Sequence, residues 1–277
     1  MKTIVIILTA FALLLFVPNT FAQKGFNLGL CLEVHSSMGG DFQVPTDLLS
    51  SNPGWINMDK DFRAGADLGL DGEYFFNDQT GLALGIHYVN LGVKFKDYTW
   101  SYAGASATLA KKIELNYVRI PVLFLWRNKL SDKLNFEVQG GIYFGILSAY
   151  HDESTISGNN GTTVTYSAEG DTYMRTDYSS GGQQTSTATF TSKPFESSDV
   201  GGIIAAGLQF KLSEKIWLPF LLNYQVGFTN VKNKSSSYNY QGTTYVYWDD
   251  GIGNRPNLSL DYKNSSIGIK TGLIIKL

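Results

Sequence analysis

Cysteine is almost missing from this sequence, since its 277 residues include only Cys31. A single cysteine excludes an intramolecular disulfide framework and a zinc site made of several thiolates. Charge is also sparse, because Asp, Glu, Lys and Arg make up 17% of the chain, against about a quarter in soluble domains. The 22 basic and 24 acidic residues give a formal net charge of -2, so no basic excess indicates binding to nucleic acid.

Proline is scarce, with 7 residues, whereas glycine (29 residues) and the aromatic residues (14% of the chain) are abundant. This composition is typical of many-stranded β proteins and disfavours a helical or Rossmann-type enzyme. After residue 25, no apolar run approaches the roughly 18 residues that mark a transmembrane helix. If the mature chain enters a membrane, we therefore expect it to do so with strands.

The N-terminus has the pattern of an export signal. Lys2 precedes an apolar run over residues 4–17, and Ala22 provides a small residue before a plausible cleavage point. The run is shorter than the roughly 20 residues of a membrane-spanning helix, which makes a transmembrane anchor the weaker interpretation. We therefore predict a signal peptide over residues 1–22 and one mature domain over residues 23–277.

The mature sequence alternates between apolar and polar residues with a period of two, which predicts β-strands. In the last stretch, Ile267 and Ile269 fall on one face and Gly268 and Lys270 on the other. The alternation changes phase once in the third and once in the fourth stretch, near Tyr88-Val89 and Tyr117-Val118, and we expect a β-bulge at each. The eight predicted strands cover about residues 26–35, 62–71, 81–100, 112–127, 134–150, 199–212, 216–230 and 267–277.

Short and long connections alternate strictly between these strands. In an up-and-down antiparallel barrel, every second connection lies at the same end, so the short ones share one rim and the long ones the other. Short periplasmic turns and long extracellular loops are typical of outer-membrane barrels. We therefore predict an all-β fold, an eight-stranded antiparallel up-and-down transmembrane barrel over residues 23–277. The short connections are 77–80, 128–133 and 213–215, and the long ones are about 41–61, 101–111, 151–198 and 232–264.

Periodicity alone does not tell which face of the strands points inward, and a soluble barrel or sandwich is the alternative. Glycine and charges of both signs on the polar face favour a narrow lumen, where opposite charges can pair. Aromatic residues also gather near the strand ends, as bilayer interfaces favour. They include Phe75, Phe76, Trp126, Phe210 and Trp217 at the short-turn rim, and Tyr98, Trp100, Tyr150 and Phe228 at the other.

The charges on the polar face are predicted to form a polar network that plugs the lumen, because eight strands leave little spare room. The alternative is a conducting pore lined by the same side chains. The predicted lumen residues are Glu33, Arg63, Asp67, Glu114, Arg119, Glu137, Lys211 and Lys270.

The segment Tyr117-Val118-Arg119-Ile120-Pro121-Val122 in the fourth strand, after a signal peptide and within eight strands, resembles the PorT-like outer-membrane β-barrel proteins of Bacteroidota. In that family a Tyr-x-x-Ile-Pro-apolar segment recurs in a middle strand, commonly with Glu where this chain has Arg119. The resemblance implies the barrel fold and the outer membrane. The founding member's link to protein secretion makes an accessory part of a secretion or envelope-assembly complex a further interpretation.

The sequence shows no pattern for catalysis, for a cofactor or for a metal. A nucleophile elbow Gly-x-Ser-x-Gly is missing. His35, His87 and His151 are the only histidines, and none belongs to a spacing typical of metal ligands. We therefore expect a non-enzymatic protein without a cofactor.

The long loops are the best candidates for function. Segment 151–198 is rich in Ser, Thr, Gly and Asn, and segment 232–264 carries aromatic residues that resemble adaptable binding surfaces. Alternation over residues 244–248 suggests a hairpin that extends the barrel wall and whose edge could accept a partner strand. The alternative is a solvated loop that only shields the barrel. The predicted binding surface consists of Tyr238, Tyr240, Tyr245, Tyr247 and Trp248.

These features together predict a rigid anchor in contact with outer-membrane lipid, whose external loops bind an extracellular ligand or an envelope protein. A small-solute pore and an accessory role in secretion or envelope assembly remain the alternatives.

Overall fold

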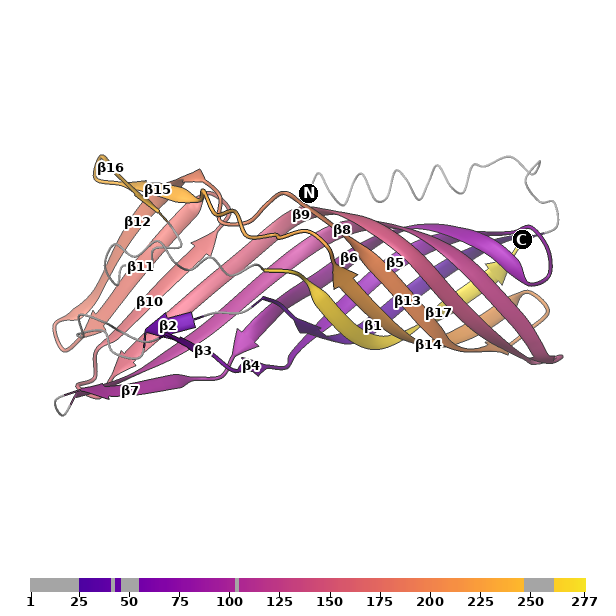
Figure 1. Ribbon diagram of the computed structural model, residues 1–277, viewed down its shortest axis with the longest axis horizontal. Helices are drawn as coiled ribbons and strands as arrows, with labels where there is room; N and C mark the ends of the chain where they lie inside the picture. Colours follow the sequence, from indigo (N-terminus) through magenta and orange to yellow (C-terminus); the bar gives the residue numbers. More distant parts are fainter. Residues whose placement is uncertain (1–24, 41–42, 46–54, 103–104, 247–261) are drawn as a thin grey trace.

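A closed wall of eight antiparallel strands forms the centre of the molecule (Figure 1). The computed structural model describes residues 25–40, 43–45, 55–102, 105–246 and 262–277. The predicted signal peptide over 1–22 lies outside these residues. The wall consists, in spatial order, of β1 (Phe26–Met38), β5 (Arg63–Phe75), β6 (Thr80–Phe95), β8 (Ala105–Ser131), β9 (Leu134–Gly158), β13 (Ser198–Lys211), β14 (Ile216–Gly227) and β17 (Ser265–Lys276).

The last strand closes the barrel by pairing with the first. The β1–β17 register runs from Asn27 opposite Lys276 to Met38 opposite Ser265. Closure leaves none of the eight wall strands with a free edge within the barrel, as hydrocarbon requires of every backbone N–H and C=O. The predicted eight-strand up-and-down barrel is confirmed. Among the described residues, no helix has the length and apolar character needed to cross a membrane.

The three predicted short connections lie at one end of the barrel, beside the C-terminus, at the right of Figure 1. In the turn between β5 and β6, the Asn77 side-chain oxygen accepts hydrogen bonds from the backbone N–H groups of Gln79 and Thr80, both at 2.8 Å. Such side-chain acceptors stabilise tight turns. The alternation of short and long connections is thus confirmed.

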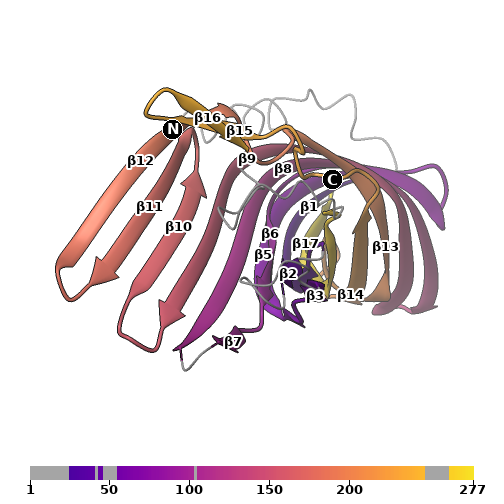
Figure 2. The same ribbon diagram turned by 60° about the vertical axis from the view of Figure 1, so that its left-hand side comes forward.

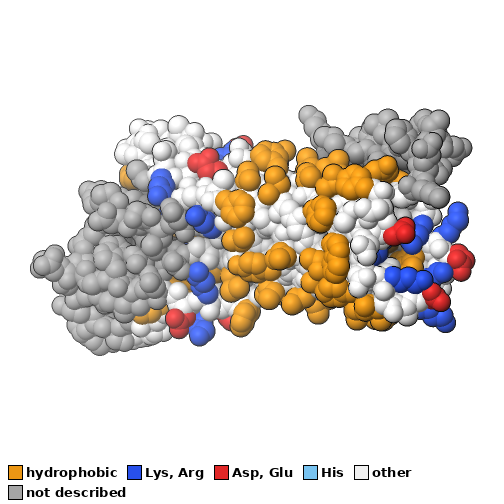
Figure 3. All heavy atoms as spheres, turned by 45° about the vertical axis from the view of Figure 1, so that its right-hand side comes forward, with side chains coloured by type: hydrophobic (Ala, Val, Ile, Leu, Met, Phe, Trp, Pro, Cys, Tyr) orange, Lys and Arg blue, Asp and Glu red, His pale blue; other side chains and the backbone are white. Residues whose placement is uncertain are grey.

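An apolar band surrounds the barrel on its outer surface, between charged residues at the two ends (Figure 3). Large apolar side chains that are exposed in this way would destabilise a protein in water, whereas a lipid bilayer covers them. Not every predicted rim aromatic contributes to it, since Phe75, Tyr150 and Trp217 are buried. Outward-facing members of the band include Leu30, Leu32, Leu84, Ile120, Val122, Phe124, Ile142, Phe144, Ile146, Ile204, Leu222 and Ile269.

The two predicted phase changes have a different cause from the one expected. Along β6, every second residue is buried from His87 to Phe95, and the β6–β8 register from His87–Arg119 to Lys94–Lys112 shows no shift. The predicted bulge in the third strand is therefore wrong. The sequence alternation reverses because the environment of the strand changes. Above the membrane, the interior of the barrel is apolar and its outer face is polar.

The one bulge near the fourth strand's phase change lies on its partner β9. Asn116 pairs with Ala149 and Tyr117 with Leu147, which leaves Ser148 as the extra residue. The Ser148 hydroxyl donates a hydrogen bond to the Asn116 carbonyl oxygen at 3.0 Å. The bulge re-aims β9, so that Tyr150 faces inward above it.

Beyond the barrel wall, the same sheet extends from the extracellular half of β9, where the sequence predicted loops (Figures 1 and 2). It continues through β10 (Thr163–Glu169), β11 (Thr172–Ser179), β12 (Gly182–Ser192), β15 (Ser237–Tyr240) and β16 (Thr243–Val246). Segment 151–198 is therefore mostly strand. The hairpin predicted in 232–264 exists as β15 and β16, and it pairs with β12.

Smaller strands complete the extracellular end. They are β7 (Tyr98–Tyr102) on β8, β4 (Lys60–Asp61) on β6, and the pair β2 (Gln43–Pro45) and β3 (Trp55–Asn57). An apolar core fills the interior there, formed by inward side chains of β6, β8 and β9 and by side chains of the long connections. Its most enclosed members are Val89, Leu91, Val93, Phe95, Leu115, Tyr117, Ala168 and Val231.

Candidate functional site: a filled lumen and an extracellular sheet

The periplasmic third of the lumen is organised around Arg127 on β8. Its Nε and Nη2 groups donate to Glu137 Oε2 at 2.9 and 2.7 Å, and Nη2 also reaches Glu73 at 3.3 Å. Gln139 and Gln209 donate side-chain amide hydrogens to the two Glu137 oxygens at 2.7 and 2.6 Å. Four donors on one enclosed carboxylate offset its desolvation, which an ion pair alone does not always achieve.

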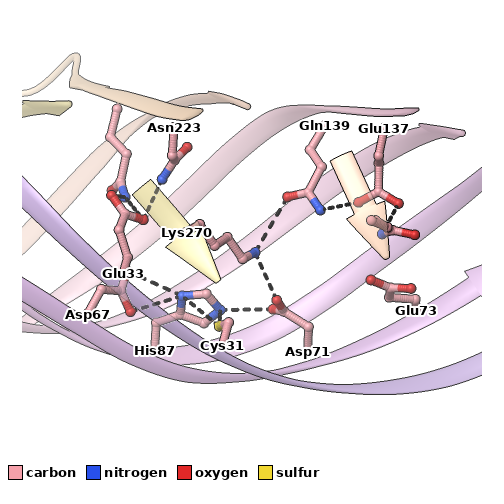
Figure 4. A network of polar contacts seen from close by, with 12 residues as sticks. Cys31, Glu33, Asp67, Asp71, Glu73, His87, Glu137, Gln139, Asn223 and Lys270 are labelled. Atoms are coloured by element: carbon pink, nitrogen blue, oxygen red, sulfur yellow. Dashed lines mark hydrogen bonds and ion pairs between the residues drawn. The ribbon is translucent and has the colours of Figure 1, made fainter. Parts of the chain in front are cut away.

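The middle of the lumen contains a chain of alternating charges (Figure 4). Lys270 Nζ lies 3.0 Å from Asp71 Oδ2 and 3.4 Å from Gln139 Oε1, which links this chain to the periplasmic cluster. The His87 ring lies between two carboxylates, with Nε2 2.8 Å from Asp71 Oδ1 and Nδ1 3.2 Å from Asp67 Oδ1. All five side chains come from inward positions of strands that the alternation places correctly.

The extracellular third of the lumen is organised around Arg119, in the segment that carries the family resemblance. Arg119 Nη2 lies 2.8 Å from Asp199 Oδ2 and 3.1 Å from the Tyr143 hydroxyl, and its guanidinium stacks 3.8 Å from the centre of the Tyr143 ring. Thr229 and Asn264 each donate a further hydrogen bond to Asp199 at 3.0 Å. Side chains from β8, β9 and β13, and from the connections that follow β14 and precede β17, meet at this carboxylate.

Side-chain amides join the extracellular cluster to Glu33. Arg119 Nη1 donates to Gln225 Oε1 at 2.6 Å, and Gln225 Nε2 in turn donates to Glu33 at 3.3 Å. Asn223 donates to the same carboxylate at 2.6 Å. The lumen is therefore filled along its length by paired charges and amides, and an apolar core lies above them.

Five of the eight predicted lumen residues lie in this network: Glu33, Asp67, Arg119, Glu137 and Lys270. Lys211 instead lies at the periplasmic end of β13, where Nζ is 3.2 Å from Glu214 and a quarter of the side chain is exposed. Its side chain contacts the turn after β13 rather than the lumen, because the strand ends there and the side chain can reach water.

Glu114 also lies outside the lumen, on the outer face of β8 above the apolar band. Arg63 pairs with it at 3.2 Å and donates to Asn90 Oδ1 at 2.7 Å, at the extracellular end of the barrel. The prediction for Glu114 is wrong because the polar face of β8 is the outer one at this height. Lys112 lies 2.6 Å from Glu114, and this hydrogen bond lowers the pKa of the Glu114 carboxyl.

The sequence prediction missed three charged partners, Glu73, Arg127 and Asp199. Each shares the odd-numbered inward alternation of its strand with a residue that was identified, such as Asp67 with Glu73 and Arg119 with Arg127. Extending the alternation to the strand ends would have found them. What the sequence does not contain is the pairing itself, since Arg119 and Asp199 come from strands that are not neighbours.

On the extracellular sheet, aromatic rings form a row across five strands. Tyr173 lies at the centre of this aromatic row, with ring centroids 4.3 Å from Tyr238, 6.3 Å from Phe190 and 6.5 Å from Tyr166. Tyr245 stacks on Tyr238 at 5.5 Å and ends the row on β16. Cross-strand aromatic pairs of this kind stabilise a sheet and present flat apolar surfaces.

The structure places the predicted loop tyrosines on this sheet. Tyr238 lies within the aromatic row and is partly buried, whereas the Tyr245 side chain is 44% exposed. Tyr240 lies on the same hairpin. Tyr247 and Trp248 lie outside the described residues.

A closed eight-strand barrel with an apolar outside and an ion-paired inside is an integral β-barrel of the outer-membrane type. The sequence profile of the outer membrane protein beta-barrel domain matches residues 21–233, and the chain belongs to this family. The protein is thus an outer-membrane β-barrel. Among curated proteins, no sequence matches this chain significantly.

Solved structures with a similar fold are outer-membrane proteins of very different sequence. OprG of Pseudomonas aeruginosa is 10% identical, with a TM-score of 0.41, over 91% of this chain and 95% of its own. The protease OmpT of Escherichia coli is 8% identical, with a TM-score of 0.41, over 91% of this chain and 96% of its own. Ail, the attachment invasion locus protein of Yersinia pestis, is 10% identical, with a TM-score of 0.31, over 91% of this chain and 100% of its own.

Proposed function

We propose that the protein is a non-enzymatic anchor that presents its extracellular sheet to a ligand or an envelope partner. The main support is the sheet of β9, β10, β11, β12, β15 and β16, which extends outward from the barrel wall and is not needed to close it (Figure 2). The barrel itself is filled with paired side chains, so its role is to hold this sheet at the cell surface.

The binding surface is centred on the open end of the aromatic row. Tyr245 supplies an exposed ring, and the exposed Arg175 guanidinium lies 5.7 Å from the Tyr166 ring centre and 2.9 Å from Asp177. Rigid aromatic rings beside hydrogen-bonding side chains bind ligands at little cost in conformational entropy. Exposed aromatic and Arg side chains are also the types that dominate binding energy at protein interfaces.

A pair of matched tyrosines tests this proposal. Tyr245 and Tyr178 are both 44% exposed and both belong to the extracellular sheet, but they lie on opposite faces of it. The full barrel, reconstituted in lipid nanodiscs, is applied to arrays of glycans and of purified envelope proteins. We expect Tyr245→Ser to weaken a specific signal at least about 10-fold, as loss of an aromatic anchor does, and Tyr178→Ser to leave it unchanged.

Equal effects of the two substitutions, or a signal that both variants keep, would contradict a binding role for the aromatic row. A complete absence of signal for the wild-type protein would favour the simpler view that the sheet only shields the barrel.

We further propose that the chain belongs to the PorT-like group within the family. This finer assignment is supported by the segment 117–122, whose Tyr117 and Arg119 are both buried. Membership of this group implies an accessory role in secretion or envelope assembly, in which the aromatic row would contact another envelope protein. Cross-linking in intact cells from position 245, with position 178 as the control, tests this role, and equal yields at the two positions would contradict it.

A small-solute pore is the less favoured function. The charged lumen would support this function, but Arg119, Arg127 and Lys270 are each paired with a carboxylate rather than lining an open path.

A further inference from the structure

The middle of the lumen brings together three side chains of the kinds that bind transition metals. They are Cys31 on β1, Asp71 on β5 and His87 on β6, all buried and all from adjacent strands. We propose that these three side chains form a site for one divalent transition-metal ion of the zinc type. The site is independent of the extracellular binding surface.

The distances between the ligand atoms suit a tetrahedral centre. Cys31 Sγ lies 3.5 Å from His87 Nε2, which lies 2.8 Å from Asp71 Oδ1. All three atoms are within 4.8 Å of one another. Metal bonds of about 2.0–2.3 Å at tetrahedral angles place ligand atoms about 3.3–3.7 Å apart. Both separations that involve His87 Nε2 are therefore within about 0.5 Å of this range, and the three side chains supply three of the four positions of a tetrahedral site.

Two glycines make room for this arrangement. Gly69 lies opposite both Cys31 and His87 in the strand register, and Gly85 lies opposite Asp71. A Cβ atom on Gly69 would overlap the imidazole ring, and one on Gly85 would overlap the Asp71 carboxylate. The absence of both side chains allows the three ligands to converge.

The surrounding groups orient the ligands as in known metal sites. The Asp67 carboxylate lies 3.2 Å from His87 Nδ1, which leaves Nε2 directed at the metal position. A metal-ligating histidine almost always donates its second ring N–H to a carboxylate, a backbone carbonyl or water, and a carboxylate is present here. Lys270 contacts the other Asp71 oxygen, Oδ2, at 3.0 Å, so that Oδ1 remains for the metal (Figure 4).

The charge of the cluster also permits one metal ion to replace two protons. Without metal, both His87 nitrogens face carboxylates, an arrangement in which each nitrogen donates, as only imidazolium can. Binding releases one proton from the imidazolium and one from the Cys31 thiol to solvent, while one doubly charged ion enters. The net charge of the enclosed cluster is unchanged. Donors of nitrogen, sulfur and oxygen favour zinc-like ions over Ca²⁺ and Mg²⁺, which prefer oxygen alone.

Cobalt(II) provides a direct probe, because a bound thiolate gives it a characteristic charge-transfer absorption. The full barrel in detergent, freed of metal by a chelator, receives Co²⁺ or Zn²⁺ either during refolding or after it. We expect one ion per barrel, a thiolate band with Co²⁺, and release of about two protons by calorimetry in buffers of different ionisation enthalpy. Asp67→Asn should weaken binding about 10–100-fold.

Two variants complete the test. Cys31→Ser removes the thiolate with almost no change in volume and should abolish the band. His35→Gln is the control, since His35 faces the same lumen but contacts the Asn90 carbonyl at 3.1 Å and Glu33 at 3.7 Å, neither of which is a proposed ligand. The proposal is overturned by absence of bound metal under both loading conditions, by a cobalt spectrum without the thiolate band, or by equal binding to Cys31→Ser. The wild-type spectrum decides the matter even if a variant fails to fold.

Discussion

Arg119 illustrates how a single lumen side chain connects distant strands. It is 2% exposed and bonds to Asp199, Tyr143 and Gln225, which come from β13, β9 and β14. An enclosed guanidinium costs several kcal/mol of lost hydration, which only a complete set of partners offsets. Removing the arginine leaves the Asp199 carboxylate enclosed without its cation, and this is more costly than losing the pair as a whole.

We expect Arg119→Leu to lower the free energy of unfolding by about 3–5 kcal/mol. Urea unfolding in lipid vesicles measures this change. Arg175→Leu is the control, because the exposed Arg175–Asp177 pair should contribute no more than about 1 kcal/mol. Adding Asp199→Asn to Arg119→Leu should restore part of the loss, and failure to restore any would argue against an Arg119–Asp199 pair.

The outer face of the barrel, unlike the lumen, requires apolar side chains. Ile142 is 57% exposed within the apolar band. An arginine at such a lipid-facing position costs about 2–4 kcal/mol near the bilayer midplane. We expect Ile142→Arg to show a loss of this size in the same unfolding measurement, and Thr187→Arg on the extracellular sheet to show almost none. Similar values for the two variants would argue against lipid contact at position 142.

Much of the lumen could be predicted from the sequence, because burial follows from alternation alone. Glu33, Asp67 and Arg119 are buried for this reason. The partners could not be predicted, because pairing depends on which strands meet across the lumen and at what height. The candidate metal site was missed for the same reason, since its ligands come from three strands and form no local motif.

The strands β6 and β8 each reverse their alternation of apolar and polar residues partway along their length. Each crosses two surroundings, first lipid outside with a polar lumen, then water outside with an apolar core. Val89 and Asn90 therefore reverse the polarity pattern without any change in backbone direction. Here the change of phase in the sequence marks the membrane boundary. Only the strand register distinguishes such a boundary from a β-bulge. The β9 extension was missed because its exposed faces carry Ser and Thr rather than an apolar alternation.

The aromatic row should stabilise the extracellular sheet locally. Tyr173 contacts three rings of the row, and aromatic pairs contribute about 0.5–1.5 kcal/mol each beyond area burial. We expect Tyr173→Ala to speed hydrogen exchange in β11 and β12 while the barrel strands keep their protection. Tyr178→Ala, on the other face, is the control. Equal exchange in the two variants would mean that the row adds no stability.

Considered as a whole, the molecule is a closed, filled cylinder with a folded extracellular end. Paired charges fill the lumen from Glu73 to Asp199, and apolar side chains such as Val231 and Tyr262 lie above them. A solute would have to break several enclosed ion pairs to pass. The eight-strand wall also leaves little space beyond that of its own side chains.

We therefore expect the purified barrel to carry no steady current in planar lipid bilayers. A porin in the same bilayer serves as the control for insertion. Steady single-channel conductance by the wild-type protein would contradict the filled lumen and favour the pore.

In this barrel the apolar strand faces contact lipid and the charged strand faces are enclosed. Spin labels placed singly at positions 141–146 on β9, in a Cys31→Ser background, distinguish the two faces residue by residue. We expect labels at 142, 144 and 146 to be accessible to oxygen dissolved in lipid and labels at 141, 143 and 145 to be inaccessible, in strict alternation. Uniform accessibility, or alternation of the opposite phase, would contradict it.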